Sequence, residues 1–446
     1  MARQYFGTDG IRGRVNTPPM TAESALRLAI AAARTFAPNG GREVVIGRDT
    51  RRSGQMIEAA LIAGLTSMGL KPVLLGIVPT PTVALMTRET GAALGLMVSA
   101  SHNKSDDNGI KLFSPAGIKL TDAEEEALEA AMASAFEGDF APPPAISTPH
   151  HMKGATTLYL ERCLETVGTD IDFSGLKIVL DCAHGAAYEV GPAALRQLGA
   201  DVTIIGDTPD GLNINAGVGS TATGLLKSTV TETGADIGIA FDGDADRVIV
   251  IDELGEEVDG DQVMALIAGE LHRANRLKGG GMVATIMSNM GLAEYLKGLD
   301  LTLARTKVGD RYVGEHMRQH GFNLGGEQSG HIILSDVSTT GDGLLAALQV
   351  LKTLASSDLP ASSIMRVFEP APQKLINIPF NGSNPLESAG VGDALTQADE
   401  LLGERGRMVV RKSGTEPLIR VMAEALDEEL MHRALSLVVA AVQAEA

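Results

Sequence analysis

The sequence predicts an α/β protein made of three related α/β domains and a smaller α+β domain. Three segments, 43–76, 176–206 and 281–309, repeat the order strand, loop, helix, glycine and strand. A strand–helix–strand unit predicts two parallel strands joined by a right-handed crossover. The length of 446 residues also favours several domains, because one domain is expected to hold roughly 100–150 residues.

Changes in composition mark the expected domain boundaries. Thr121 and Glu124 form a capping box that opens a surface helix, and the proline-rich stretch 141–150 after it is typical of a linker. Two more boundaries are expected near 252–261 and before the prolines of 368–373. The predicted domains are 1–150, 151–253, 254–368 and 369–446.

The last domain is predicted to be small and to combine a sheet with helices. Short aliphatic runs predict strands over 374–378, 407–411 and 418–422. Helices are expected around 394–402 and from about residue 430 to the end of the chain. This order differs from the repeat of the first three domains.

Charge and composition argue against several classes of protein. A formal net charge of −19 disfavours a general nucleic-acid binder, which would carry a basic stripe. No apolar run approaches the ~18–20 residues of a membrane span, and the first residues lack the apolar core of a signal peptide. Two cysteines are too few for a disulfide framework. We therefore expect a cytoplasmic protein in which any phosphorylated ligand meets a local basic cluster.

The acidic loop FDGDADR, residues 241–247, is the most specific local signal. Asp242, Asp244 and Asp246 alternate with small residues between two apolar strands. This spacing lets three carboxylates converge on one hard cation, whereas in a solvated acidic turn they would only repel one another. Arg247 stands where an EF-hand calcium loop needs glycine. We therefore expect Mg²⁺ with open coordination positions rather than a closed calcium site.

The apolar run 94–98 predicts a buried strand that ends on the polar segment SASHN, residues 99–103. Ser101 and His102 lie in that segment, and Lys111 follows it. Two interpretations are open from these residues. The segment is either a polar turn or a serine nucleophile activated at the mouth of a site.

The loop RKSGTEP, residues 411–417, predicts a phosphate site. It follows a strand, carries two hydroxyls and a glycine, and is flanked by Arg411 and Arg420. Backbone N–H groups around the glycine can form an anion nest that arginine side chains complete. The alternative is a polar turn with unrelated surface cations.

Weaker signals come from three other segments. In GGEQSG, Glu327 and Ser329 would point the same way if the chain were extended, which suits vicinal sugar hydroxyls. Arg12 lies in a glycine-rich opening and could contact phosphate. The pair Arg51 and Arg52 is a further basic candidate. Each of these segments could equally be an ordinary surface turn.

Together these segments resemble the α-D-phosphohexomutase superfamily over essentially the whole chain. Within it, FGTDGIRG at the start, GEQSG and TKVGDRYV resemble the members that act on glucosamine phosphates. The four superfamily signatures occur in the usual order: SASHN at 99–103, DGDADR at 242–247, GEQSG at 326–330 and RKSGTEP at 411–417.

The resemblance implies four domains with mixed sheets around a central cleft. It implies an isomerase that converts glucosamine 6-phosphate reversibly to glucosamine 1-phosphate through a sugar 1,6-bisphosphate, feeding UDP-N-acetylglucosamine and cell-wall precursor synthesis. Mg²⁺ is the implied cofactor, and glucosamine or glucose 1,6-bisphosphate is the implied activator. The implied partner is a small phosphosugar, with neither nucleic acid nor membrane, and a homodimer is compatible with the resemblance.

The resemblance also assigns roles to residues. Ser101 would carry the transferred phosphoryl group and add a ligand to the metal held by Asp242, Asp244 and Asp246. Lys111 would be a general acid/base, which requires its pKa to be lowered toward neutral. The other implied catalytic residues are His102, Arg12 and Arg247. Glu327 and Ser329 would bind the sugar. The implied ligands of the phosphate that is not transferred are Arg411, Ser413, Gly414, Thr415 and Arg420.

Three alternatives remain open at this point. A phosphoglucomutase or phosphomannomutase of the same superfamily would use the same residues on another sugar. A magnesium-dependent phosphohydrolase would use Asp242 as its nucleophile, although the strand that follows the acidic loop at once leaves no room for a cap. A non-catalytic sugar-phosphate binder would explain the phosphate loop but not the serine beside a metal site.

Overall fold

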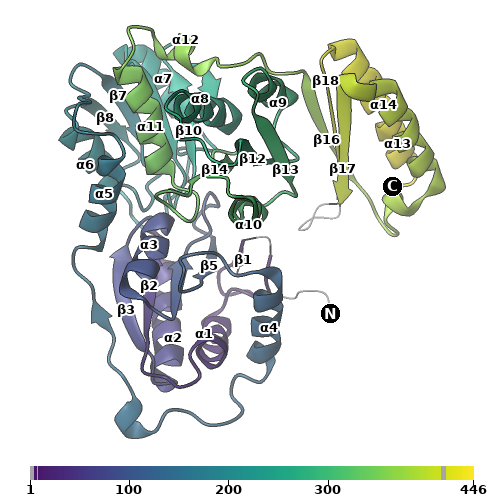
Figure 1. Cartoon of the computed structure of the whole chain (residues 1–446). Helices are drawn as coiled ribbons and strands as arrows, with labels where there is room; N and C mark the ends of the chain where they lie inside the picture. Colours follow the sequence, from purple (N-terminus) through teal and green to yellow (C-terminus); the bar gives the residue numbers. More distant parts are fainter. Residues whose placement is uncertain (1–4, 8, 413–417) are drawn as a thin grey trace.

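The computed structural model describes residues 5–7, 9–412 and 418–446 as four sheet-containing units. Figure 1 shows the first unit, in purple and blue, below the second and third, in teal and green, while the yellow last unit projects to one side. The sheets have six, five, four and three strands in chain order. Three mixed α/β sheets and a small antiparallel sheet are the predicted fold class.

The first unit has the strand order β1-β5-β4-β2-β3-β6, with β2, β3 and β4 parallel and β5 antiparallel to β4. The predicted strand 94–98 is confirmed as β4, all of it buried. The predicted capping box is also confirmed, because the Thr121 and Glu124 side chains each bond the other's backbone N–H at the start of α4. The strands are Ile11–Arg14 (β1), Glu43–Arg48 (β2), Lys71–Ile77 (β3), Leu94–Val98 (β4), Asp107–Phe113 (β5) and His150–His151 (β6). The helices are Ala22–Phe36 (α1), Ser53–Ser67 (α2), Thr80–Thr90 (α3) and Asp122–Ala133 (α4), followed by a 3₁₀ turn at Pro143–Ala145.

In the second unit, β7, β8 and β9 are parallel and β10 turns back beside β9. β9 and β10 are wholly buried, and the acidic loop joins them. β11 pairs with β10 and so extends this sheet past residue 253. The strands are Lys177–Asp181 (β7), Asp201–Ile205 (β8), Ile237–Phe241 (β9), Val248–Asp252 (β10) and Glu257–Val258 (β11). The helices are Ala155–Glu165 (α5), Val190–Gln197 (α6) and Gly224–Thr233 (α7).

The third unit has the strand order β13-β12-β14-β15, with a β14–β15 hairpin at one edge. Its apolar residues form one continuous core with those of the second unit, so these two units pack as one body. The strands are Gly281–Thr285 (β12), Thr302–Thr306 (β13), Leu324–Gly326 (β14) and Ile332–Leu334 (β15). The helices are Gly260–Arg273 (α8), Met290–Lys297 (α9), Asp310–His320 (α10), Gly343–Ala355 (α11) and Ala361–Met365 (α12).

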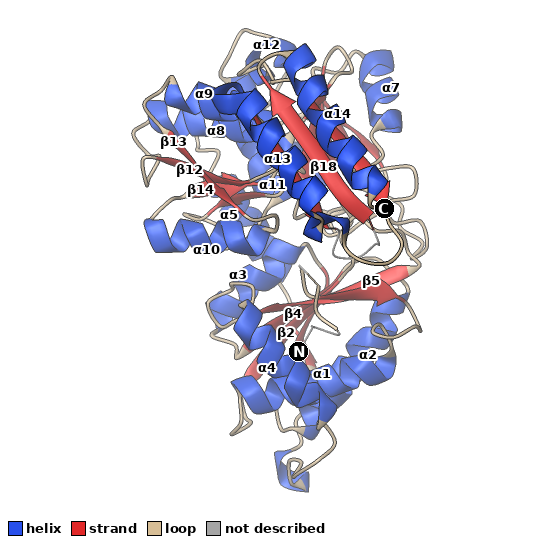
Figure 2. Cartoon of the chain, turned by 90° about the vertical axis from the view of Figure 1, so that its right-hand side faces the viewer, coloured by secondary structure: helices blue, strands red, loops and turns tan. Residues whose placement is uncertain are grey.

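The last unit has its own apolar core between a three-stranded antiparallel sheet and two helices. Figure 2 shows α13 and α14 lying side by side over one face of this sheet. The three predicted strands and two predicted helices are confirmed. The elements are Gln373–Pro379 (β16), Ala389–Leu402 (α13), Gly406–Lys412 (β17), Leu418–Ala425 (β18) and Glu428–Ala444 (α14), with 3₁₀ turns at Pro385–Glu387 and Gly403–Arg405.

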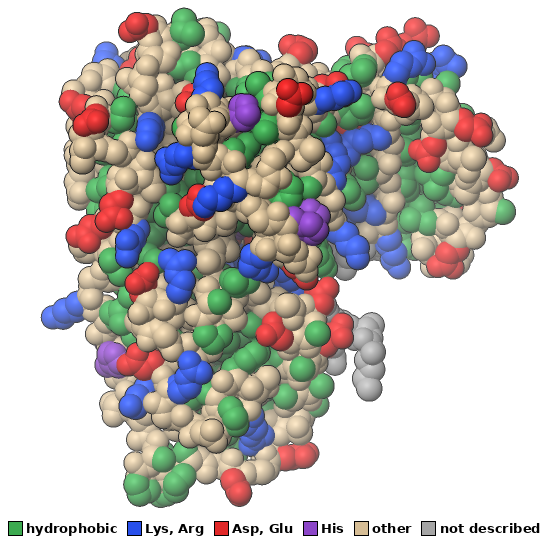
Figure 3. All heavy atoms as spheres, viewed as in Figure 1, with side chains coloured by type: hydrophobic (Ala, Val, Ile, Leu, Met, Phe, Trp, Pro, Cys, Tyr) green, Lys and Arg blue, Asp and Glu red, His purple; other side chains and the backbone are tan. Residues whose placement is uncertain are grey.

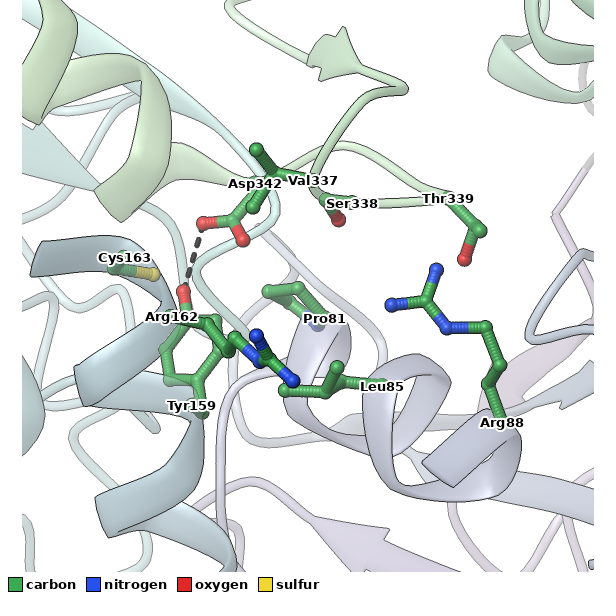
Figure 4. A pocket seen from close by; sticks show the side chains of 10 residues that line it. All are labelled: Pro81, Leu85, Arg88, Tyr159, Arg162, Cys163, Val337, Ser338, Thr339 and Asp342. Atoms are coloured by element: carbon green, nitrogen blue, oxygen red, sulfur yellow. Dashed lines mark hydrogen bonds between the residues drawn. The ribbon is translucent and has the colours of Figure 1, made fainter. Parts of the chain in front are cut away.

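The first three units meet at a small pocket between α3, α5 and the loop before α11 (Figure 4). The hydroxyl of Tyr159 donates a 2.7 Å hydrogen bond to Asp342, which also accepts from the backbone N–H of Leu345 and so caps α11. Among its lining residues there is no predicted site residue. The pocket therefore lies at the contact between units and apart from the predicted site.

No helix in the described part of the chain is long and apolar enough to span a membrane.

Candidate active site

The acidic loop forms a buried cluster of three carboxylates. Asp242, Asp244 and Asp246 each offer an oxygen, and these oxygens lie within 4.8 Å of one another. Burial, followed by the charges of Asp246 and Asp244, raises the pKa of Asp242 to about 8. The Oδ1 atom of Asp244 accepts no hydrogen bond from any described residue, and that of Asp246 has only longer contacts, 3.5 Å to His331 and 3.9 Å to Arg247. Crowded, partly unsatisfied carboxylates are the donor set that Mg²⁺ prefers, so the residues present fit that ion.

Ser101 lies against this cluster, at the end of β4. Its hydroxyl donates a 2.5 Å hydrogen bond to Asp242, and Nδ1 of His102 lies 3.3 Å from the same hydroxyl. Burial, followed by the charges of Arg247 and Arg12, lowers the pKa of His102 to about 4. His102 is therefore neutral at pH 7 and can accept or donate one hydrogen bond next to Ser101.

Lys111 reaches the same cluster from β5. Its ammonium lies 2.7 Å from Asp244, 2.6 Å from Asp246 and 3.3 Å from Asp9. Burial would lower the pKa of Lys111, but these carboxylates outweigh it and hold the pKa well above its ordinary value. The lowered pKa expected of a general acid/base is therefore not found in this arrangement, because three carboxylates face one amine.

Six charged side chains form a closed cycle of alternating sign, here called the charge ring. Lys111 contacts Asp9, Lys119 contacts both Asp9 and Asp310, and His331 contacts Asp310 and Asp246. The Lys111–Asp246 contact closes the cycle. The ring joins three units, because Asp9, Lys111 and Lys119 come from the first, Asp246 from the second, and Asp310 and His331 from the third.

Two arginines flank the acidic loop. Arg12, on β1, pairs with Asp9, and its side chain is 24% exposed. The backbone N–H of Arg247 donates to Asp242 at 3.2 Å, and its guanidinium lies 3.9 Å from Asp246. Burial would lower the pKa of Arg247, but the charges of Asp246 and Asp242 outweigh burial and hold the pKa above its ordinary value. The guanidinium therefore stays charged. Both cations can therefore face an anionic group next to Ser101.

Glu327 and Ser329 lie in the turn between β14 and β15. The segment is a turn and not extended, because the N–H of Gly330 donates back to the carbonyl of Glu327 at 3.0 Å. The two side chains are nevertheless adjacent, with the Ser329 hydroxyl 3.4 Å from the Glu327 carboxylate. Gly330 has a φ of 86°, and a Cβ there would lie 1.9 Å from the carbonyl oxygen of Val248. Glycine therefore allows this turn to seat beside the acidic loop.

Arg411 and Arg420 lie directly opposite each other on β17 and β18. Burial and the charge of Arg420 lower the pKa of Arg411. Like charges directly opposite in a sheet are destabilising, which an anion between them would relieve. Lys and Arg side chains gather where the last unit faces the third (Figure 3). The predicted ligands Ser413, Gly414 and Thr415 lie outside the described residues.

Known proteins and family models match this chain along nearly its whole length. Its successive segments match the family models described as phosphoglucomutase/phosphomannomutase α/β/α domains I, II and III and C-terminal domain, over 3–139, 152–255, 259–371 and 375–441. A phosphoglucosamine mutase of Hyphomonas neptunium is 73% identical over 446 residues, covering 100% of this chain and 99% of the relative. That of Caulobacter vibrioides is 54% identical and covers 99% of each chain. The chain belongs to the phosphoglucosamine mutase family.

Membership in the phosphoglucosamine mutase family makes the chain a phosphohexomutase, an isomerase, as the sequence predicts. Solved structures agree on the fold. A phosphoglucomutase/phosphomannomutase family protein of Burkholderia thailandensis has a TM-score of 0.83 at 24% identity, with 98% of this chain and 97% of that chain covered. An N-acetylphosphoglucosamine mutase of Aspergillus fumigatus, in complex with GlcNAc-6P and magnesium, has a TM-score of 0.61 at 18% identity, covering 99% and 96%.

The structure brings together most of the predicted catalytic and metal-binding residues. Ser101, His102, Lys111, Arg12 and Arg247 all lie at the acidic loop. Sequence reasoning missed four members of the charge ring. Asp9 lies in FGTDGIRG, Asp310 lies in TKVGDRYV, and His331 directly follows GEQSG. Their position in or next to these singled-out segments was the available signal. The missed residues are Asp9, Lys119, Asp310 and His331.

Proposed function

We propose that this phosphohexomutase interconverts glucosamine 6-phosphate and glucosamine 1-phosphate through phosphorylated Ser101. One observation carries the proposal: the Ser101 hydroxyl bonds Asp242 at 2.5 Å, at the edge of a buried cluster of three carboxylates. A serine in that position can carry a phosphoryl group whose charge a metal site compensates. The names of the relatives support glucosamine phosphate as the substrate.

Asp242, Asp244 and Asp246 would hold Mg²⁺, and a phosphoryl oxygen on Ser101 would complete their site. When bound, Mg²⁺ would neutralise charge that builds up on the phosphoryl group during transfer. Arg247 and Arg12 both lie close enough to His102, the neighbour of Ser101, for their charges to lower its pKa, so their guanidinium groups would hold the phosphoryl oxygens.

The proposed reaction has two half-reactions. In the first, the bond between phosphorus and Ser101 Oγ breaks and a bond to the free sugar hydroxyl forms, giving the 1,6-bisphosphate. In the second, the other phosphoryl group moves to Ser101, and the sugar oxygen that it leaves gains a proton. Lys111, an ammonium in this structure, would donate that proton. The first half-reaction runs the same transfer backwards and needs Lys111 as the neutral amine. Lys111 would have to lose its proton first, which requires that Asp244 and Asp246 no longer pair with it, as they would not while holding Mg²⁺.

The intermediate has to turn over between the half-reactions, because its two phosphates exchange places. Glu327 and Ser329 would bind sugar hydroxyls in both orientations, while Arg411 and Arg420 would hold whichever phosphate is not transferred. The last unit meets the third through hydrogen bonds from Arg407 to Ile286 and from Met290 to Glu424. Further hydrogen bonds of Asn289 with Ala371 and of Gln373 with Met287 cross the same joint. Because the last unit has a core of its own, we expect it to open at this joint during the step.

The test is phosphorus NMR of the protein with Mg²⁺, glucosamine 6-phosphate and a trace of glucose 1,6-bisphosphate to phosphorylate Ser101. We expect a 1-phosphate signal that grows faster than with glucose 6-phosphate or mannose 6-phosphate, and no such signal for Ser101→Ala. Faster turnover of glucose or mannose 6-phosphate would assign another sugar of the superfamily. Release of free phosphate alone would point to hydrolysis. A homodimer and a cytoplasmic location stay predictions, to be measured by sedimentation and by cell fractionation.

A further inference from the structure

The backbone at Ser101 is in the left-handed region, with a φ of 53°. A residue with a Cβ adopts this conformation at a cost, and it persists only where the surroundings impose it. Here it turns the chain at the end of β4 so that the hydroxyl of Ser101 meets Asp242. The groups that impose this conformation therefore also aim the residue that carries the phosphoryl group in the proposed function.

Arg51 is one of these groups. Its side chain is 0% exposed, and its guanidinium donates to the carbonyl oxygens of Ser101 at 2.9 Å and Asn103 at 2.7 Å. It also donates to the carbonyls of Lys104 and Asp107 and pairs with Asp49 at 2.8 Å. A buried guanidinium whose donors are all used does not face a ligand, so Arg51 is not a ligand-binding cation. Arg52, the other half of the predicted basic pair, is exposed, and its guanidinium donates to the carbonyl of Asp210 at 3.3 Å.

Asn215 grips the same two carbonyls from the second unit. Its amide nitrogen donates to the carbonyls of Ser101 and Asn103, each at 2.9 Å. Asn215 is itself left-handed, with a φ of 55°, and is 4% exposed. Arg51 and Asn215 are therefore donors from different units that converge on one pair of acceptors, 164 residues apart in the chain.

We propose that Arg51 and Asn215 are positioning residues for phosphoryl transfer, forming a carbonyl clamp that holds Ser101 in its left-handed conformation. The clamp keeps the carbonyl oxygens of Ser101 and Asn103 hydrogen-bonded. It also couples the segment 99–107, here called the Ser101 loop, to the second unit, which carries the acidic loop. The inference rests on the proposed function, because it concerns the phosphorylation of Ser101.

Asn215→Gly is the first test, because glycine adopts a left-handed φ without strain and removes only the amide. Asn275→Gly is the matched control, since Asn275 is also left-handed, at 55°, but exposed and in the third unit. The measurements are the rate at which glucose 1,6-bisphosphate phosphorylates Ser101, the kcat and KM for glucosamine 6-phosphate, and the melting temperature.

For Asn215→Gly we expect Ser101 phosphorylation and kcat to fall at least roughly tenfold, because small displacements of a reacting group are costly. KM should stay within about twofold of the wild type, since the groups proposed to bind the sugar and its second phosphate are untouched. Asn275→Gly should match the wild type in all three quantities. Equal phosphorylation rates in Asn215→Gly and the wild type would overturn the clamp.

If Asn215→Gly folds poorly, Arg51→Lys tests the carbonyl clamp instead. Arg52→Lys, at the exposed neighbouring residue, is its control. Lysine keeps the charge but cannot donate to four carbonyls and Asp49 at once. We expect slower Ser101 phosphorylation in Arg51→Lys at temperatures well below its melting point, and an unchanged rate in Arg52→Lys. If the wild type itself takes no phosphoryl group on Ser101, the proposed function fails. If only the variant effects are missing, the clamp alone fails.

Discussion

Nε2 of His331 lies 2.9 Å from the Oδ2 atom of Asp310, and this contact is the part of the charge ring that lies within the third unit. Burial would lower the pKa of His331, but Asp310 and Asp246 raise it to about 10. His331 is therefore an imidazolium at neutral pH, and the ring balances three cations against three carboxylates. This balance lets the three units dock around charges that would each be costly to bury alone.

Asp310→Asn should destabilise the protein strongly, because it leaves Lys119 and His331 short of a carboxylate in a buried site. Removing one partner of a buried ion pair typically lowers the free energy of unfolding by about 3–5 kcal/mol. Urea denaturation measures this quantity. Glu270→Gln, in an exposed pair with Arg273, is the control and should change it by less than about 1 kcal/mol. Equal small losses in both variants would show that the ring is not stabilising.

Asp181 should make stability depend on pH. Burial raises its pKa to about 6, although the backbone N–H groups of Gly219 and Ala183 donate to it. The folded protein then holds a proton that the unfolded chain, with the ordinary pKa near 3.8, has released. Stability from this group is therefore present at low pH and is lost as the pH rises from about 4 through about 6, by up to roughly 3 kcal/mol.

The measurement for Asp181 is urea denaturation of the wild type and of Asp181→Asn across pH 4 to 7. The variant is expected to be less stable overall, since asparagine has one acceptor oxygen for two N–H donors. The decisive quantity is the unfolding free energy of the wild type minus that of Asp181→Asn. This difference should fall as the pH rises. A difference that stays constant with pH would mean that Asp181 titrates normally.

Local patterns were enough to predict the parts of the fold that depend on local chemistry. The run 94–98 is apolar and ends on turn residues, so its burial as β4 follows from the residues themselves. Asp242, Asp244 and Asp246 alternate within one short loop, so their convergence could also be predicted. Both signals lie within a few residues of sequence.

The charge ring and the carbonyl clamp could not be predicted, because their partners lie far apart in the sequence and several meet only when the units dock. Asp9 and Asp310 lie 301 positions apart, and both contact Lys119. Arginine is usually a surface residue, and Arg51 is buried only because the Ser101 loop, residues 99–107, runs around its guanidinium. The left-handed φ of Ser101 is likewise a consequence of tertiary contacts.

Added Mg²⁺ should stabilise the folded protein, because the acidic loop concentrates three buried carboxylates; burial, followed by the charges of Asp246 and Asp244, raises the pKa of Asp242 to about 8. At 100 times its dissociation constant a ligand adds about 2.7 kcal/mol to the free energy of unfolding. The melting temperature should therefore rise with Mg²⁺ concentration in the wild type and in Glu232→Gln, an exposed change in the same unit. It should rise much less in Asp244→Asn. The same Mg²⁺ response in all three proteins would place the ion elsewhere.

Arg411→Ala should separate activity from stability. Arg411 faces Arg420 across the sheet, so its removal relieves a repulsion and the melting temperature should not fall. The value of kcat/KM for glucosamine 6-phosphate should drop by roughly 10- to 100-fold, the usual effect of losing a hydrogen bond to a charged group. The exposed Arg405→Ala in the same unit serves as control and should leave kcat/KM unchanged. If Arg411→Ala keeps its kcat/KM, the two arginines do not form the phosphate site. If it instead loses stability and activity together, Arg411 supports the fold of the last unit rather than binding an anion.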